Sequence, residues 1–240
     1  MKAPVVRTAL VALGTTIAVL TCIAAAAAPV CPTHPVNAGV KTIQAVMATG
    51  RFVAYQPTSL QVIDGRLTQA DVVSIREDLK VLRPRFDGLI TYGSINGAEK
   101  IPDIAAEFGF RAVIMGIWDV GESADLDNVI AAARRHPKLV AGVSIGNERV
   151  FAGQVGFDEM TRTLATVRKR LPQLAMSTSE PFHVFLQPQA ASLLGELDLM
   201  LAIVHPLHQP WFKSAPIANS ADFVGNVLGD LLYGDRKSVV

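Results

Sequence analysis

The stretch "GVSIGNERV" at positions 142–150 offers two alternative sets of residues for catalysis. Its two glycines, Gly142 and Gly146, flank Ser144 in a G-x-S-x-G pattern, which in many hydrolases presents a nucleophilic serine on a sharp turn. The next residues, Asn147 and Glu148, instead place an amide and a carboxylate at the end of an apolar run. A carboxyl group in such a position is suited to giving a proton to a reacting group or removing one from it.

The serine alternative needs more than the pattern itself. The serine turn should pass directly from a strand into a helix, with an oxyanion loop upstream and an aspartate and then a histidine downstream. Asp198 followed by His205 or His208 supplies the downstream order. However, glycines recur where the helix should start, and no upstream histidine belongs to an HGGG-type loop. We therefore expect Ser144 to be a small residue inside a strand.

In the carboxylate alternative, Gly146 lets the chain turn and Glu148 faces a cleft. The acid can protonate the leaving oxygen of a glycoside, and the amide of Asn147 can hydrogen-bond a sugar hydroxyl. Other apolar runs are likewise followed by polar or aromatic side chains, namely Tyr92, Trp118, Glu180 and His205.

Seven β-rich apolar runs position these residues, each bounded by Gly, Pro or Asn. They are "RFVAYQP", "FDGLITYG", "FRAVIMGIW", "LVAGVSIGNE", "QLAMSTSEP", "LDLMLAIVHP" and "KSVV". Between them, helical spacing predicts helices over 68–82, 98–108, 124–136, 157–171, 187–194 and 220–233. In the first of these helices we expect Thr68 to cap the amino end and Asp71 to lie in the first turn.

Alternation of strands and helices predicts an α/β fold with a parallel sheet, either doubly wound or a (β/α)8 barrel. Functional side chains after many different strands favour the barrel. No glycine-rich phosphate loop follows any run, which argues against a nucleotide site. The sequence therefore predicts a TIM-barrel-type domain over residues 51–240, incomplete at its C-terminus because it has about seven strands.

Four motifs follow one another along the chain: "ITYGSINGAEKIPDIAAEFGFRAVIMGIW", "VAGVSIGNERVFAG", "STSEPF" and "VHPLHQPWF". In order and spacing they resemble the glycoside hydrolase family 17 barrels, the β-1,3-glucanase-like enzymes, from about Phe52 to Val240. The resemblance implies that Glu148 is the general acid/base and that Asn147 contacts the sugar at the cleavage site. It also implies a substrate cleft lined by Tyr92, Trp118, Glu180 and His205, with Trp211 resembling an aromatic sugar platform.

Each of these residues also has a structural alternative. Tyr92 and Trp118 could be ordinary packing at strand ends, since large aromatic side chains dominate cores. His205 could be a buried imidazole with satisfied hydrogen bonds, and Glu180 could pair with an arginine.

The resemblance breaks down at the second carboxylate. In the family a nucleophilic glutamate lies just past the seventh strand, in a segment resembling "ETG", whereas this chain ends at "RKSVV". Retaining hydrolysis uses two carboxyl groups about 5 Å apart. We therefore expect the nucleophile to lie beyond Val240, with Glu180 as an alternative second carboxylate. The expected function is retaining hydrolysis of β-1,3-linked glucan, without metal or cofactor; the alternatives are glucan transglycosylation and noncatalytic glucan binding.

The first 28 residues have the pattern of an export signal. Lys2 and Arg7 precede an apolar stretch that ends in small residues. Its length also approaches that of a membrane span, so an uncleaved anchor is the alternative. We expect a periplasmic or extracellular protein in which residues 29–50 lead into the barrel. Cys22 falls in the signal and Cys31 in the lead-in, so no disulfide is expected within the domain.

Composition agrees with a globular domain that buries a sizeable core, because half of the 240 residues are hydrophobic and 18% are charged. The formal net charge is only +1 and there is no long basic run. We therefore expect a glucan or oligosaccharide partner and no nucleic acid, with membrane contact only through an uncleaved anchor.

Overall fold

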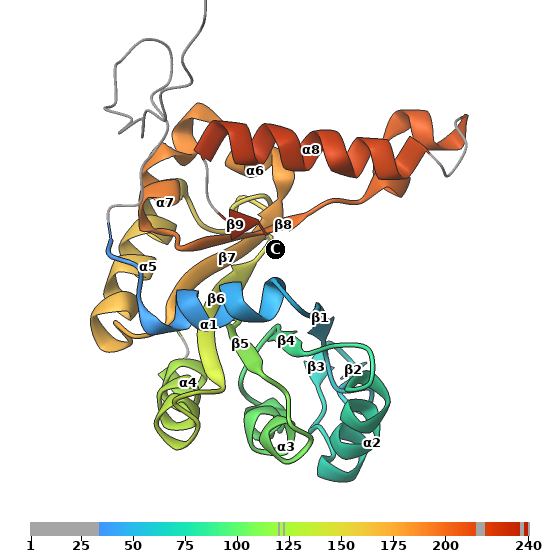
Figure 1. Cartoon of the computed structure of the whole chain (residues 1–240), viewed down its shortest axis with the longest axis vertical. Helices are drawn as coiled ribbons and strands as arrows, with labels where there is room; N and C mark the ends of the chain where they lie inside the picture. Colours follow the sequence, from blue (N-terminus) through green and yellow to red (C-terminus); the bar gives the residue numbers. More distant parts are fainter. Residues whose placement is uncertain (1–33, 120, 122, 215–218, 236–237, 240) are drawn as a thin grey trace, which may run out of the picture.

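Six parallel strands curve into a half-barrel in the computed structural model, which describes residues 34–119, 121, 123–214, 219–235 and 238–239 (Figure 1). A short seventh strand, β9, continues the sheet beside β8. In spatial order the strands are β1 (Phe52–Tyr55), β4 (Gly88–Thr91), β5 (Ala112–Ile117), β6 (Val140–Asn147), β7 (Ala175–Pro181), β8 (Leu199–Ile203) and β9 (Ser238–Val239). All seven apolar runs form strands, so the predicted α/β fold is confirmed as a partial TIM-barrel-like fold.

Helices follow the strands in the predicted order. The longer ones are α2 (Val72–Leu82), α3 (Ile101–Glu107), α4 (Ser123–Arg135), α5 (Phe157–Arg170), α7 (Ala191–Glu196) and α8 (Asn219–Asp235). Shorter turns are α6 (Phe182–Phe185), η1 (Ala98–Lys100), η2 (Pro188–Ala190), η3 (Pro206–His208) and η4 (Pro210–Lys213). In α5 the residues at helical spacing, Met160, Leu164 and Val167, are buried, as an amphipathic helix against a sheet requires.

The predicted cap of the first predicted helix is wrong. Helix α2 begins at Val72 and its cap is Asp71, whose side chain accepts hydrogen bonds from the backbone N–H groups of Val73 and Ser74, both at 3.3 Å. The hydroxyl of Thr68 instead bonds to the backbone of the preceding loop. The helix therefore starts one turn later than the sequence pattern predicts.

A small hairpin, which the strand pattern did not predict, occupies the space before α2. Its strands are β2 (Val62–Ile63) and β3 (Arg66–Leu67), which pair antiparallel. The two turn residues, Asp64 and Gly65, both have positive φ, as two-residue hairpin turns require. The Asp-Gly pair at positions 64 and 65 is the feature of the sequence that could have predicted this hairpin.

The two faces of the sheet bury different sets of residues. On β5, Val113, Met115 and Ile117 pack in the larger core with the outer helices, whereas Ala112 and Ile114 pack in a smaller core on the inner face. This alternation is the expected period of two along a strand.

Helix α1 (Ala38–Met47) covers the amino-terminal part of that inner face (Figure 1). It lies in the segment expected only to lead into the barrel. Val40, Ile43 and Val46 recur at helical spacing and are buried in the smaller core. At Gly39 the backbones approach so closely that an added Cβ would lie 1.9 Å from the carbonyl oxygen of Ala141.

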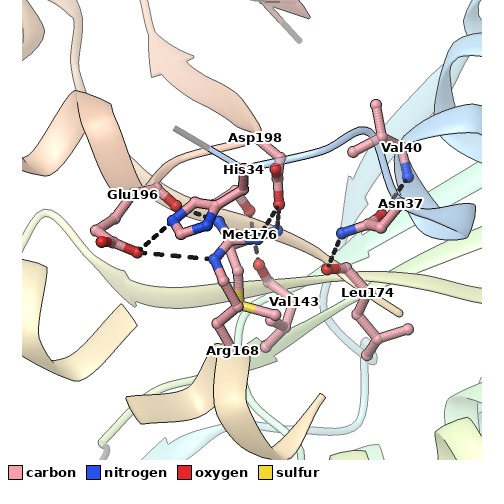
Figure 2. Close-up of polar contacts among 10 residues, drawn as sticks. His34, Asn37, Val40, Val143, Arg168, Leu174, Met176, Glu196 and Asp198 are labelled. Atoms are coloured by element: carbon pink, nitrogen blue, oxygen red, sulfur yellow. Dashed lines mark hydrogen bonds and ion pairs between the residues drawn. The ribbon is translucent and has the colours of Figure 1, made fainter. Parts of the chain in front are cut away.

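Polar contacts fix the start of α1 at the amino ends of the strands, as Figure 2 shows. The side-chain amide of Asn37 donates to the carbonyl of Leu174 at 2.8 Å, and its oxygen accepts from the Val40 N–H. His34 contacts Glu196 at 2.9 Å. The segment before β1 is therefore part of the folded domain.

The expected signal or anchor over residues 1–28, with Cys22, lies outside the described residues, as does Cys31. Within the described ranges, no helix is both long enough and apolar enough to cross a bilayer.

If α1 belongs to the cooperative core, Ile43→Ala should lower the free energy of unfolding by about 2–5 kcal/mol, because it leaves a cavity at a fully buried position. The exposed neighbour Gln44→Ala is the control and should change it by less than about 0.5 kcal/mol. Urea denaturation followed by circular dichroism measures both. An Ile43→Ala effect no larger than that of the control would mean that α1 docks independently of the barrel.

Candidate active site

The carboxyl ends of the parallel strands meet at one edge of the half-barrel, where they surround a cavity of about 420 Å³. Ile90 and Leu201 on the inner face of the sheet contribute to its wall and also belong to the core beneath α1. The cavity therefore occupies the part of the inner face that α1 leaves open. It brings together side chains from β4, β6 and β8 or from the residues that follow them, namely Tyr92, Ser144, Asn147, Glu148 and His205.

The backbone around Glu148 is unusual. The pairing of β6 with β7 shifts register between Ser144 and Asn147, and Gly146 has a φ of 73°. Glu148 itself has a φ of 55°, in the left-handed region that disfavours side chains other than glycine by roughly 1–2 kcal/mol. Its N–H donates to the carbonyl of Ser179 on β7 at 2.8 Å. Strained backbone of this kind is characteristic of functional sites.

Glu180 lies under the loop that follows Glu148. Its side chain is fully buried, and its carboxylate accepts hydrogen bonds from the N–H groups of Val150 at 2.9 Å and Phe151 at 3.1 Å. Burial raises the pKa of Glu180, the backbone N–H groups of Val150, Phe151 and Arg149 act in the opposite direction, and the nearby Glu148 raises the pKa further. Its partners are thus backbone groups and not the arginine considered as an alternative, and it is not part of the cavity wall.

A second, largely apolar cavity of about 510 Å³ adjoins the first and shares Thr91 and Tyr92 with it. Trp118 lies on its wall. The side chains of Tyr92 and Trp118 are 40% and 49% exposed, so packing at strand ends does not account for them. Both rings are available to a ligand that lies along the two cavities.

Asp125, near the start of α4, ties together the loops that carry these two aromatic residues. It is fully buried and accepts hydrogen bonds from the backbone N–H groups of Ser94 at 2.6 Å and Trp118 at 2.9 Å. Burial raises the pKa of Asp125, and the N–H donors partly offset that effect. The sequence pattern of α4 does not predict that Asp125 holds these loops, because Ser94 and Trp118 lie outside that helix.

His205 and Trp211 are placed differently from each other. His205 is exposed on the cavity wall beside His208, with 5.3 Å between the ring centroids, so it is not a buried imidazole. Trp211 is half-buried against Phe223 of α8, with 5.4 Å between the centroids, and it lies on neither cavity wall. Its role as a sugar platform stays a prediction.

The residues of the serine alternative are not brought together. Ser144 is buried within β6 and paired on both sides, instead of standing on a turn into a helix. Asp198 precedes β8 at the opposite end of the sheet from His205, and its carboxylate binds Arg168 at 2.9 Å and the N–H of Met176 at 2.8 Å (Figure 2). Ser144 is therefore a small strand residue that lines the cavity.

Glu148 is the one carboxylate among the described residues that line the first cavity. In the same described part of the chain, no group of three or more His, Cys, Asp or Glu side chains could hold a metal ion. The chemistry available to this wall is proton transfer by Glu148, next to the amide of Asn147 and the ring of Tyr92.

Comparison with known proteins relates this architecture to a class of glycan-active enzymes. A glucan 1,3-β-glucosidase from Arthroderma benhamiae is 26% identical over 129 residues, which cover 52% of this chain and 42% of that protein. The chain therefore spans less than half the length of this curated relative. No protein-family model matches the chain.

Solved structures share the fold. The glycoside hydrolase family 17 β-1,3-glucanosyltransferase from Rhizomucor miehei superposes with a TM-score of 0.59 at 17% identity, covering 80% of this chain and 70% of the enzyme. An active-site mutant of that enzyme has been solved in complex with laminaritriose. An endo-laminarinase from Formosa gives a TM-score of 0.64 at 12% identity over 80% of this chain and 65% of its own. The chain thus has family 17 β-1,3-glucanase-like relatives by sequence and by structure, which confirms the resemblance predicted from the motifs.

The raised pKa of Asp125 predicts a pH effect on stability. The folded chain holds this proton more tightly than the unfolded chain, so the contribution of Asp125 is complete below its ordinary pKa of 3.8 and is lost as the pH rises through the raised value. Asp125→Asn removes this titration. The difference in free energy of unfolding, wild type minus variant, should therefore fall as the pH rises above 3.8, in urea denaturation at a series of pH values. A difference that grows with pH would contradict the assignment.

Proposed function

We propose that the chain carries the glucan-binding wall and the general acid/base of a retaining glycoside hydrolase that acts on β-1,3-linked glucan. The observation that carries the proposal is the position of Glu148, on the cavity wall at the end of β6 beside Asn147 and close to Tyr92. The relatives, whose names include a glucan 1,3-β-glucosidase and a β-1,3-glucanosyltransferase, support this substrate class.

In the proposed mechanism, the Glu148 carboxyl gives its proton to the glycosidic oxygen as the bond to the anomeric carbon breaks. The amide of Asn147 hydrogen-bonds a hydroxyl of the sugar at that carbon, and Tyr92 packs against a sugar ring. Once an anionic group has attacked the anomeric carbon from the opposite side, Glu148 acts as a base. It then removes a proton from the water or sugar hydroxyl that resolves the intermediate.

The attacking group is not assigned to any described residue of the cavity wall, where Glu148 is the one carboxylate. The family resemblance places it after the seventh strand. Hydrolysis and transglycosylation differ only in whether water or a sugar hydroxyl resolves the intermediate, so both belong to this proposal. From the pattern of the first 28 residues we propose that the protein is exported.

A noncatalytic glucan-binding barrel is the second candidate, and it is favoured because Glu148 is the one carboxylate among the described residues that line the first cavity. Both candidates require the exposed rings of Tyr92 and Trp118 to contact sugar, and only the enzyme requires proton transfer by Glu148.

Tyr92→Ala should weaken the binding of laminaritriose by about tenfold, because it removes the ring shared by the two cavities. Isothermal titration calorimetry measures the dissociation constant. Val81→Ala, an exposed apolar residue on α2 away from both cavities, is the control and should leave it unchanged. Equal affinities of wild type and Tyr92→Ala would show that the sugar does not occupy this edge.

Glu148→Gln should keep the binding of laminari-oligosaccharides and reduce the formation of new reducing ends or longer products by about 10²–10⁴-fold, because an amide cannot transfer the proton. Chromatography of the products measures this, with the exposed Glu77→Gln of α2 as the matched control. Activity retained in Glu148→Gln would refute its role. Binding without any product by a wild-type protein that includes the segment after the seventh strand would select the noncatalytic barrel.

A further inference from the structure

We propose that Glu180 is a positioning residue, which holds the loop that presents Glu148 and does not itself contact the sugar. This inference rests on the proposed function of Glu148. It differs from the role that the family resemblance implies for Glu180, which is to line the substrate cleft.

Two adjacent residues of β7 fix the backbone on both sides of the strained turn. The carbonyl of Ser179 accepts the N–H of Glu148 itself, at 2.8 Å. The Glu180 carboxylate accepts the N–H groups of Val150 and Phe151, at 2.9 and 3.1 Å. Because Glu148 has a positive φ, its conformation persists only if the backbone that follows is held in place.

Glu180 is placed for this role and not for contact with a ligand. Its side chain is 0% exposed, and its two carboxylate oxygens each accept a backbone N–H from the loop. An attack on an anomeric carbon would require a carboxylate oxygen that faces the cavity. The geometry therefore also separates Glu180 from the second carboxylate of a retaining mechanism.

Within the loop itself, the N–H of Ala152 donates to the carbonyl of Glu148 at 2.8 Å and the N–H of Gln154 donates to the carbonyl of Arg149 at 3.0 Å. Its other contacts involve side chains. Arg149 donates to the carbonyl of Trp118 at 3.3 Å and lies 3.7 Å from Asp119. The ring of Phe151 meets His183 edge-on, with 5.4 Å between the centroids. These contacts orient the loop against its neighbours, but they satisfy neither of the two N–H groups that Glu180 binds.

Glu180→Gln tests the proposal, because it preserves the side-chain volume and replaces one acceptor oxygen with an NH₂ group that faces a backbone donor. Amide hydrogen exchange by NMR should show that Val150 and Phe151 exchange roughly tenfold faster than in the wild type. Turnover of laminari-oligosaccharides should fall by about 100-fold, because a displacement of about 1 Å at the acid has an effect of that size. The Michaelis constant and the affinity for laminaritriose should change less than about twofold.

Asp198→Asn is the matched control, since it removes a buried carboxylate that also accepts a backbone N–H, but at the opposite end of the sheet. It should leave the Val150 and Phe151 amides and the turnover unchanged. If Glu180→Gln does not fold, Glu180→Asp tests the same role. It keeps the charge, but its side chain is one methylene shorter, so its oxygens lie farther from the Val150 and Phe151 N–H groups.

A loss of laminaritriose affinity in Glu180→Gln, with unchanged exchange of the two amides, would overturn the proposal in favour of direct sugar contact. Unchanged exchange together with unchanged turnover would overturn it as well. If the wild type neither binds nor converts laminari-oligosaccharides, the proposed function fails, while the exchange of the two amides still decides whether Glu180 holds the loop.

Discussion

The end of β6 is fixed by its parallel pairing with β7, and the geometry of the site follows from that pairing. The N–H of Glu148 is bound to the carbonyl of Ser179 after the ladder has shifted register, and Gly146 and Glu148 both adopt positive φ to make this possible. A regular strand would alternate its side chains without interruption. The irregularity instead directs Glu148 onto the wall of a cavity whose floor is the inner face of the sheet.

At this edge of the sheet, the side chains of buried carboxylates accept hydrogen bonds from backbone N–H groups of the loops. Asp125 holds the loops after β4 and β5, and Glu180 holds the loop after β6, in each case through backbone N–H groups. Neither carboxylate has an arginine or lysine partner among the described ion pairs, so backbone dipoles stabilise their charge and burial opposes it. The aromatic rings and the proposed acid therefore project from loops whose backbone is held by these two buried carboxylates.

The sequence was sufficient to predict the sheet, because strands buried on both faces appear as continuous apolar runs, and polar residues after each run lie at one edge of a parallel sheet. It was insufficient where a role depends on a distant partner. Thr68 has the chemistry of a cap, but the hairpin before α2 engages its hydroxyl. Glu180 resembles a cleft residue until its bonds to Val150 and Phe151 are seen. The apolar spacing of α1 was present in the sequence, but the face that it covers is defined only once the sheet curves.

The central claim is that Glu148 faces the bond to be broken, and a crystal structure of this chain soaked with laminaritriose tests it most directly. The account predicts that a Glu148 carboxyl oxygen lies about 2.6–3.2 Å from a glycosidic oxygen of the bound sugar. Laminaritriose bound elsewhere on the surface, or bound in the cavity with Glu148 turned away from every glycosidic oxygen, would contradict the account.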